Sequence, residues 1–347
     1  MNADWQDFLR AAGATIDDDT VSFDETAALN AADGGTLLAD LSSLGIIRVT
    51  GEEARDFLQN QFSSDVREVN DSRSQISSYC TAKGRILAIF RIVQQDDALL
   101  LILPRATLDN TLKRLRMFVL RSKVELTDAS DEQVLLGLAG TAAPDLVRAT
   151  CGAVPAGVDD VIHGGGARVV RLHGETPRFL VLAGPDTAPD LWQSWVAGDG
   201  GATPGGETAW RLLTIRAGEP AIAPETMESF VPQMMNLEIL GGVSFRKGCY
   251  PGQEIVARTH YLGKLKRRMF LTHSETPDAI APGTEVYVAG GNQAIGEVVQ
   301  AAPAPTGGQE LTAVLRLDNR DDALRLGGPD GPALVVNDPP YDLTLSE

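Results

Sequence analysis

Residues 75–94 read QISSYCTAKGRILAIFRIVQ, and this stretch decides the fold. Two β-like runs, 75–82 and 86–94, meet at Lys83-Gly84, which is the sequence signal of a β-hairpin. An amphipathic helix opens after Gly51 on the N-terminal side. A third β-like run at 98–103 follows the hairpin.

The segments after the hairpin complete one module. Pro104 precedes a helix with leucines at helical spacing, Leu108, Leu112 and Leu115, and a strand is expected near 124–126. The order α-β-β-β-α-β over residues 51–127, with the short apolar strand before it, therefore predicts a split-βαβ, ferredoxin-like module.

The remaining chain predicts two further units. Residues 133–217 alternate short strands and helices as a second mixed α/β region. After Met269, short strands are separated by Pro and Gly turns, which predicts a small β-barrel or sandwich. The expected fold class is α+β.

The composition excludes several classes of protein. The 347 residues carry a net charge of −17, which argues against a surface that coats nucleic acid. No run of about 18 apolar residues occurs and the N-terminal segment is acidic, so we expect a cytoplasmic protein without a secretory signal. Cys80, Cys151 and Cys249 form no C-x-x-C pair, so no metal site held by this chain alone is expected.

Residues 245–254 read FRKGCYPGQE and place a cysteine before an expected helix start at Pro251. A helix N-terminus and nearby Lys247 would favour the thiolate of Cys249. The same pattern suits a small buried cysteine that fills a corner. From these residues alone both interpretations stay open.

A basic cluster surrounds this stretch. Residues 246–268 hold one acid, Glu254, and seven cations: Arg246, Lys247, Arg258, Lys264, Lys266, Arg267 and Arg268. The cluster predicts either an anion-binding surface or a solvated helix end.

An irregular segment rich in Pro and Gly precedes the cysteine. Residues 218–245 show few regular periods, which is typical of a binding loop or lid, and Gln233 and Asn236 offer polar side chains there. Trp210, on the helix before it, is either core or a wall on which a flat heterocycle stacks.

Several motifs in order resemble one family. Lys247-Gly248-Cys249-Tyr250-Pro251-Gly252-Gln253-Glu254 matches the K-G-C-Y-x-G-Q-E signature of the YgfZ-type proteins, which are folate-binding relatives of the glycine-cleavage aminomethyltransferase. Three further stretches are similar to family elements: GEEARDFLQNQFSSD at 51–65, YCTAKGR at 79–85 and FVPQMMNL at 230–237. The resemblance spans residues 40 to about 270.

The resemblance implies a three-domain, aminomethyltransferase-like ring around a folate-sized cavity. The implied parts are a discontinuous mixed α/β folate-binding domain (1–50 plus 128–245), the ferredoxin-like module (51–127), a linking loop and helix (246–268) and a C-terminal small β-barrel (269–347).

It also implies the site residues. Cys249 and Lys247 would carry the chemistry, within a signature of Lys247, Gly248, Cys249, Tyr250, Gly252, Gln253 and Glu254. The implied cofactor is tetrahydrofolate or a folate derivative, contacted by Trp210, Leu44, Tyr79, Arg216, Gln233 and Asn236. The anionic tail of the folate would meet Arg246, Arg258 and Lys264.

The chain departs from the aminomethyltransferases at two carboxylates. Residues 85–90 read RILAIF where those enzymes carry an acidic pair, and Arg216 stands before Ala217-Gly218 where they carry Glu. A carboxylate would bond the donor edge of the pterin and manage protons, so glycine-cleavage catalysis is not expected. Glu225 is the nearest substitute, and Leu44 stands where an aromatic residue could cap the cavity.

The resemblance favours a folate-binding accessory protein for assembly or repair of iron–sulfur enzymes, which would support tRNA modification indirectly. Its expected partners are iron–sulfur client enzymes or assembly proteins. A folate-dependent one-carbon transferase or demethylase acting on a small amine is the alternative. Direct tRNA binding is not expected, because the chain is acidic and aromatic residues are scarce among its cations.

Overall fold

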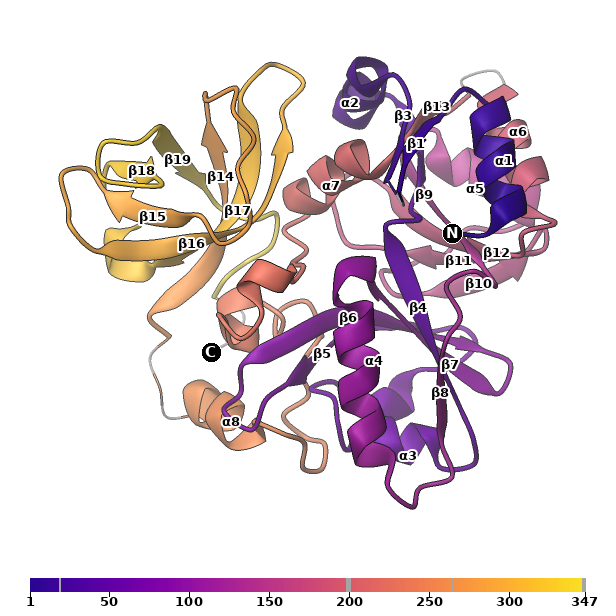
Figure 1. Cartoon of the computed structure of the whole chain (residues 1–347), viewed down its shortest axis with the longest axis horizontal. Helices are drawn as coiled ribbons and strands as arrows, with labels where there is room; N and C mark the ends of the chain where they lie inside the picture. The colour runs from indigo at the N-terminus through magenta and orange to yellow at the C-terminus, as the bar shows by residue number, and fades with distance from the viewer. Residues whose placement is uncertain (19, 198–200, 262, 264, 345–347) are drawn as a thin grey trace.

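The computed structural model describes residues 1–18, 20–197, 201–261, 263 and 265–344. It confirms an α+β chain with two large sheets and a closed barrel. Figure 1 shows the barrel beside the sheet that carries the N-terminus, and the sheet with the predicted hairpin below them. Helix α7 lies between the barrel and the sheet that carries the N-terminus (Figure 1).

The predicted hairpin lies in a five-stranded antiparallel sheet. Its strands, in spatial order, are β5 (Gln75–Cys80), β6 (Ile86–Gln95), β7 (Ala98–Pro104), β4 (Leu44–Thr50) and β8 (Glu125–Asp128). Helices α3 (Ala54–Gln59) and α4 (Arg105–Val119) share an apolar core with it, in which Phe62 and Phe90 lie with ring centroids 4.4 Å apart. Strand β4 precedes the boundary expected at residue 51, yet it pairs with β7 and β8 and so belongs to this sheet.

A six-stranded sheet forms the second part. Its strands, in spatial order, are β10 (Val161–Gly164), β11 (Ala167–Arg171), β12 (Arg178–Ala183), β9 (Val134–Gly140), β3 (Thr36–Asp40) and β13 (Thr203–Gly205). Only the β3–β13 pair is parallel among these neighbours. The accompanying elements are α1 (Ala3–Ala11), β1 (Thr15–Asp17), β2 (Thr20–Ser22), α2 (Glu25–Gly34), α5 (Ala143–Cys151), α6 (Ala188–Ala197) and α7 (Glu207–Arg216). Trp5, Trp192 and Trp195 fill the core on one side of the sheet, and Trp210 belongs to the cluster that includes Leu37 and Leu180.

The C-terminal part is the predicted barrel. Its strands close in the order β14 (Arg267–Ser274), β17 (Gln309–Arg316), β16 (Ala294–Pro303), β15 (Glu285–Val288), β18 (Leu324–Leu326) and β19 (Ala333–Asn337). Closure leaves no unpaired edge that could recruit another strand, which suits a barrel of such short strands.

The segment between α7 and β14 is largely irregular, as expected. Its short elements are the 3-10 turns η2 (Pro224–Thr226) and η3 (Pro232–Met235) and the helix α8 (Gln253–Tyr261); η1 (Val66–Glu68) and η4 (Leu317–Asn319) lie elsewhere. Phe230, Met235 and Leu237 of this segment are buried against both the β5–β6 hairpin and the barrel. The segment is therefore the packing layer between two parts of the fold. Within the described residues, no helix combines the length and apolarity that crossing a membrane requires.

Candidate functional site

A cavity opens where the two large sheets, α7 and the barrel meet. Its volume is 180 Å³, and its wall includes Leu44, Phe90, Ile102, Leu180 and Trp210. Pockets for drug-sized ligands measure ~300–1,000 Å³, so this cavity can enclose one ring system of a larger ligand. The rest of such a ligand would lie in the mouth.

Trp210 forms part of this wall, and its position follows from two neighbours. A Cβ on Gly137 of β9 would come within 2.5 Å of the indole, so the missing side chain lets the ring lie against the sheet. The guanidinium carbon of Arg178 lies 5.0 Å from the ring centroid, which is a cation–π contact. Because the residue is only 7% exposed, Trp210 is a fixed wall of which a ligand can reach a small part.

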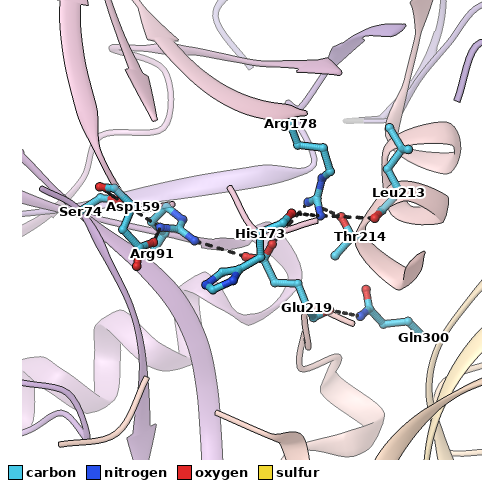
Figure 2. A network of polar contacts seen from close by, with 9 residues as sticks. All are labelled: Ser74, Arg91, Asp159, His173, Arg178, Leu213, Thr214, Glu219 and Gln300. Atoms are coloured by element: carbon cyan, nitrogen blue, oxygen red, sulfur yellow. Dashed lines mark hydrogen bonds and ion pairs between the residues drawn. The ribbon is translucent and has the colours of Figure 1, made fainter. Parts of the chain in front are cut away.

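Glu219 is the centre of a buried ionic network beside the cavity (Figure 2). Its Oε1 lies 3.5 Å from Nη2 of Arg91, and its Oε2 lies 3.4 Å from Nη2 of Arg178. Gln300 donates a hydrogen bond of 3.0 Å to the Glu219 carbonyl. Arg91 is on β6, Arg178 begins β12 and Gln300 is on β16, so Glu219 ties together all three parts of the fold.

The two arginines have further partners in the protein, although Nε of Arg178 is buried without a hydrogen-bond partner among the described residues. Arg91 pairs with Asp159 and donates to Ser74 Oγ at 3.0 Å. Arg178 donates to the carbonyls of His173 (3.1 Å) and Leu213 (3.3 Å) and to Thr214 Oγ1 (3.2 Å). This arrangement satisfies the rule that buried charges are paired and hydrogen-bonded.

The network keeps Glu219 anionic. Burial alone would raise the pKa of this carboxyl, but the charges of Arg178, Arg91 and His173 outweigh burial and the pKa is lowered. The pKa of His173 is lowered chiefly by burial, against the attraction of Glu219. His173 Nε2 is buried and has no partner among the described residues.

The cavity therefore combines an apolar wall with two carboxylates, Glu219 and Glu207, and the guanidiniums of Arg91, Arg178 and Arg211, of which Arg211 pairs with Glu207. Both carboxylate oxygens of Glu219 are engaged at long distances of 3.4–3.5 Å, and each can accept a further hydrogen bond. Such a wall suits a flat, neutral ring with an N–H donor edge. A carboxylate with a lowered pKa is a weak base, so it is better suited to orienting a ligand than to accepting its proton.

The expected folate contacts divide into two groups. Leu44 and Trp210 line the cavity. Tyr79, Arg216, Gln233 and Asn236 are not among the residues that line it.

Each of these four side chains has a partner elsewhere. Tyr79 packs edge-on against Phe62 in the core of the module. Arg216 pairs with Glu310 of the barrel at 2.6 Å and with Asp33 of α2 at 2.9 Å.

The amides of the irregular segment satisfy buried groups. Gln233 Nε2 donates to the Val256 carbonyl at 2.6 Å, and Asn236 Nδ2 donates to the Met269 carbonyl at 2.9 Å. Backbone outside regular structure needs such partners when it is buried, which explains these polar side chains.

Neither carboxylate of the cavity wall, Glu207 or Glu219, is predicted from the sequence. Arg216, where the related enzymes carry Glu, points away, and Glu219 three residues later takes a place in the wall. Glu225, the substitute named from the sequence, lies in η2, is exposed, and is outside the wall.

Lys247 holds the signature loop to the module. Its Nζ donates to three backbone carbonyls, those of Gln59 (2.6 Å), Phe62 (2.6 Å) and Ser64 (2.8 Å). The ammonium lies 5.2 Å from the Tyr250 ring centroid. Burial lowers the pKa of Lys247 to about 8. All three donors are used on carbonyls, so the expectation that Lys247 tunes the Cys249 thiol finds no contact in its support.

Two glycines bring the signature loop against the hairpin tip. Gly252 has φ +84°, and a Cβ there would lie 2.5 Å from Gly84 Cα and 2.6 Å from the Thr81 carbonyl oxygen. The YCTAKGR stretch at 79–85 and the signature loop, which contain these two glycines, therefore contact each other. Their spacing in the sequence gave no sign of it.

Cys249 is exposed within this fixed loop. Helix α8 begins at Gln253, so Pro251 and Gly252 precede it and the expected helix start at Pro251 is wrong. Gln253 and Glu254 form the first turn, Gly248 is exposed and Tyr250 is buried. Cys80, by contrast, is buried, and burial raises the pKa of its thiol to about 12.

The residues predicted for the folate tail lie outside the cavity wall. Arg246 and Arg258 are exposed on the loop and on α8. Lys264 lies outside the described residues.

Comparison with known proteins agrees with this fold. The family profile described as the GCVT N-terminal domain matches residues 20–174. The solved glycine cleavage system aminomethyltransferase T from Bartonella henselae superposes with a TM-score of 0.79 over 99% of this chain and 98% of that one, at 16% identity, which shows the fold.

Curated relatives are more similar in sequence. The tRNA-modifying protein YgfZ of Colwellia psychrerythraea is 32% identical over 311 residues, covering 89% of this chain and 94% of the relative. The proteins of the same name from Hamiltonella defensa and Klebsiella pneumoniae are each 30% identical, over 86% and 88% of this chain and 88% and 93% of their own lengths. The chain therefore belongs to the family of the tRNA-modifying protein YgfZ.

Proposed function

We propose that this protein is a folate-binding accessory factor for the assembly or repair of iron–sulfur enzymes in the cytoplasm, and that it supports tRNA modification through those enzymes. The supporting observation is the cavity at the junction of the three parts, with an anionic acceptor, Glu219, beside an apolar wall. The division into a folate-binding domain, a module and a barrel is part of this proposal, with β4 assigned to the module.

The residues of the cavity fit the head group of tetrahydrofolate. A pterin is flat and carries N–H donors on one edge, which match the free acceptor capacity of Glu219. The volume of 180 Å³ fits a ring system, and the glutamyl tail would leave through the mouth.

The proposed role in iron–sulfur assembly depends on Cys249. Its thiol is exposed in a loop that Lys247 and Gly252 fix from both sides. One thiol can hold an iron–sulfur cluster only together with thiols of a partner, so Cys249 would handle a cluster or sulfur species during transfer.

Calorimetric titration of tetrahydrofolate tests the cavity. Glu219→Gln should weaken binding about 10- to 100-fold, because it removes a charged acceptor. Glu225→Gln, an acid of the same irregular segment outside the wall, is the matched control and should bind like wild type. Trp210→Phe should weaken binding while Trp192→Phe, in the remote core, should not. Equal affinity of the Glu219 and Glu225 variants would remove the cavity from the proposal.

The thiol is tested separately. Cys249→Ser should bind folate normally and fold normally, yet fail to restore iron–sulfur enzyme activity in cells that lack this protein. Full restoration would contradict the role of the thiol and leave folate binding untouched.

A one-carbon transferase is the second candidate, because the cavity does contain a carboxylate. The lowered pKa of Glu219 argues against it as a proton acceptor. The purified protein can be incubated with tetrahydrofolate and methylamines, and the folate then analysed by chromatography. We expect no turnover.

A further inference from the structure

The C-terminal end of helix α4 exposes apolar side chains that the core does not use. The buried face of the helix carries Leu112 and Leu115, whereas Met117 and Phe118 are 58% and 45% exposed. Leu120, which follows the helix, is 86% exposed. Three of the seven exposed large apolar side chains among the described residues thus stand within four positions. Single exposed apolar side chains are ordinary on a protein surface, but a group of them typically marks an interaction site.

Leu120 is also held in an unfavourable backbone conformation. Its φ is +47°, in the left-handed region where glycine is the usual residue after the end of a helix. A strained residue persists where packing or binding compensates for the strain. The side chain of Leu120 lies almost entirely in water, so packing within this chain compensates for little of it. The strain and the exposure together point to a contact outside this chain.

A hollow of 660 Å³ opens beside these side chains. It is lined by residues 118–122 and by Glu53, which precedes α3. Sites for small ligands measure ~300–1,000 Å³, so the hollow can receive several side chains of a partner. The carboxylate of Glu53 already accepts a hydrogen bond of 2.6 Å from the Lys123 amide. Figure 1 shows the end of α4 and the loop to β8 at the lower end of the molecule, away from the barrel and from the sheet that carries the N-terminus.

The same segment of the chain is strongly basic. Residues 113–123 read KRLRMFVLRSK and hold five cations and no acid, on a chain whose net charge is −17. Three of these cations are engaged within the protein: Arg114 with Tyr79, Arg116 with the Leu126 carbonyl and Lys123 with Glu52. The other two, Lys113 and Arg121, are exposed and form no salt bridge with any residue that the structure describes.

The two unpaired cations border the apolar group. Lys113 lies one turn before Met117, and residues four positions apart are neighbours on one face of a helix. Arg121 follows Leu120 directly and lines the hollow. We call Lys113, Met117, Phe118, Leu120 and Arg121 the α4 surface.

We propose that the α4 surface docks an amphipathic helix of a partner protein, whose apolar stripe is bordered by acidic residues. The apolar side chains of that helix would pack on Phe118 and Leu120 and enter the hollow, as in other helix-in-groove contacts. Its carboxylates would pair with Lys113 and Arg121, which the described part of this chain leaves without counter-charges. The inference does not depend on the proposed function.

Charge disfavours two other occupants of the α4 surface. Two copies of this chain that met through it would bring Lys113 and Arg121 against like charges. An anionic membrane would attract these two cations but repel the remainder of a chain with a net charge of −17. A bilayer surface would also leave the hollow beside Leu120 unfilled.

Nuclear magnetic resonance of the six methionine methyl groups tests the proposal on the full chain. The probe is a designed helical peptide with leucines at i, i+3, i+4 and i+7 and glutamates on both sides of that stripe. We expect the Met117 signal to shift saturably with a dissociation constant below about 1 mM. The signals of Met235 and Met269, which are buried, should stay in place. No shift of Met117 at millimolar peptide would overturn the proposal.

Three further titrations separate the possible occupants. A peptide with lysines in place of the glutamates should bind at least about 10-fold more weakly, because like charges would face each other. Equal affinity of the two peptides would overturn the acidic assignment. A larger Met117 shift with phosphatidylglycerol vesicles would assign the surface to a membrane instead. A shift on raising the protein concentration alone would assign it to a second copy.

Leu120→Gly separates docking from folding. Glycine tolerates a φ of +47°, so the variant should melt at a higher temperature than wild type, yet bind the peptide at least about 5-fold more weakly. A lower melting temperature or unchanged affinity would contradict the role of Leu120.

The charges of the α4 surface are tested by a matched pair of double variants. Lys113→Gln/Arg121→Gln should weaken binding about 3- to 10-fold, as the loss of two exposed ion pairs would. Arg10→Gln/Lys83→Gln removes the same charge from exposed positions elsewhere and should leave binding unchanged. Equal losses in the two double variants would overturn the charge complementarity.

Discussion

The signature loop and the cavity wall are built in opposite ways. The loop residues stand together in the sequence and form a motif, and most of them serve to fix the backbone: Lys247 binds three carbonyls, and Gly252 permits contact with Gly84. The ionic wall of the cavity comes from separate segments, with Arg91, Arg178 and Glu219 outside all the stretches that resemble family motifs. The signature motif thus marks a loop whose backbone is held in place, and we call this loop, residues 247–254, the mount. The charged residues of the cavity, in contrast, come from separate segments of the chain.

The largest expected effect concerns the mount. Lys247→Met leaves three buried carbonyls without their donor, so we expect a loss of about 3–5 kcal/mol in the free energy of unfolding. Lys83→Met, an exposed lysine on the adjacent hairpin tip, should change it by less than about 0.5 kcal/mol. Urea denaturation measures both. A similar small change for Lys247→Met would show that the motif lysine serves chemistry and not support.

The next effect separates two glycines of one motif. Gly252→Ala should cost about 2–4 kcal/mol, because its Cβ meets backbone at 2.5–2.6 Å and its φ is +84°. Gly248→Ala is the matched control, since a Cβ there meets nothing within 4 Å. Thermal unfolding of the pair measures the difference. Equal melting temperatures would break the link between the loop and the hairpin.

A substitution at the cavity should lower the free energy of unfolding by less, and by an amount that depends on pH. Glu219→Gln should cost about 1–3 kcal/mol at pH 7, because the two arginines lose their shared counter-charge. The pKa of Glu219 is lowered in the folded protein, so its contribution is full above the ordinary value of 4.5 and is lost as pH falls through the folded value. The difference between wild type and variant should therefore shrink below about pH 4.5.

Asp40 provides a control of opposite sign. Burial raises the pKa of this carboxyl, although Trp5 and Ser42 hydrogen-bond to it, so its contribution is full below the ordinary value of 3.8 and is lost as pH rises through the folded value. Unfolding of Asp40→Asn and Glu219→Gln between pH 3 and 6 should give opposite trends. Parallel trends would mean that the network does not keep Glu219 anionic.

The smallest effect is expected for the residue that the motif displays. Cys249 is exposed, so Cys249→Ser should change stability by less than about 0.5 kcal/mol. A destabilisation above about 1 kcal/mol in urea would show that the thiol is packed and belongs to the mount itself.

Patterns local in sequence predicted most of the fold. The hairpin at Lys83-Gly84, the helix with Leu108, Leu112 and Leu115, and the barrel after Met269 are all present, because period and turn chemistry act between neighbours in the chain. The domain boundary expected at residue 51 lies between β4 and its sheet partners β7 and β8, because a boundary drawn along the chain does not show long-range strand pairing.

The candidate site was less predictable. Gln233 and Asn236 suggested ligand contacts, but burial of an irregular backbone already demanded their amides. A usable signal for the network did exist: Arg91 and Arg178 are lone charges in apolar runs, IFRIV and RFLVLA, and a charge buried in a strand requires a partner. Which acid supplies it could be known only from the fold.

The attachment of Lys247 also sets the order of events during synthesis. Its acceptors begin at Gln59, 188 positions earlier, so Lys247 can reach them only after the whole five-stranded sheet, which ends at Asp128, has been synthesised. A chain arrested or misfolded before that point exposes a cysteine on a loose strand of polypeptide. The thiol is therefore oriented only after the loop at residues 247–254 has been synthesised, well after its acceptors at residues 59–64.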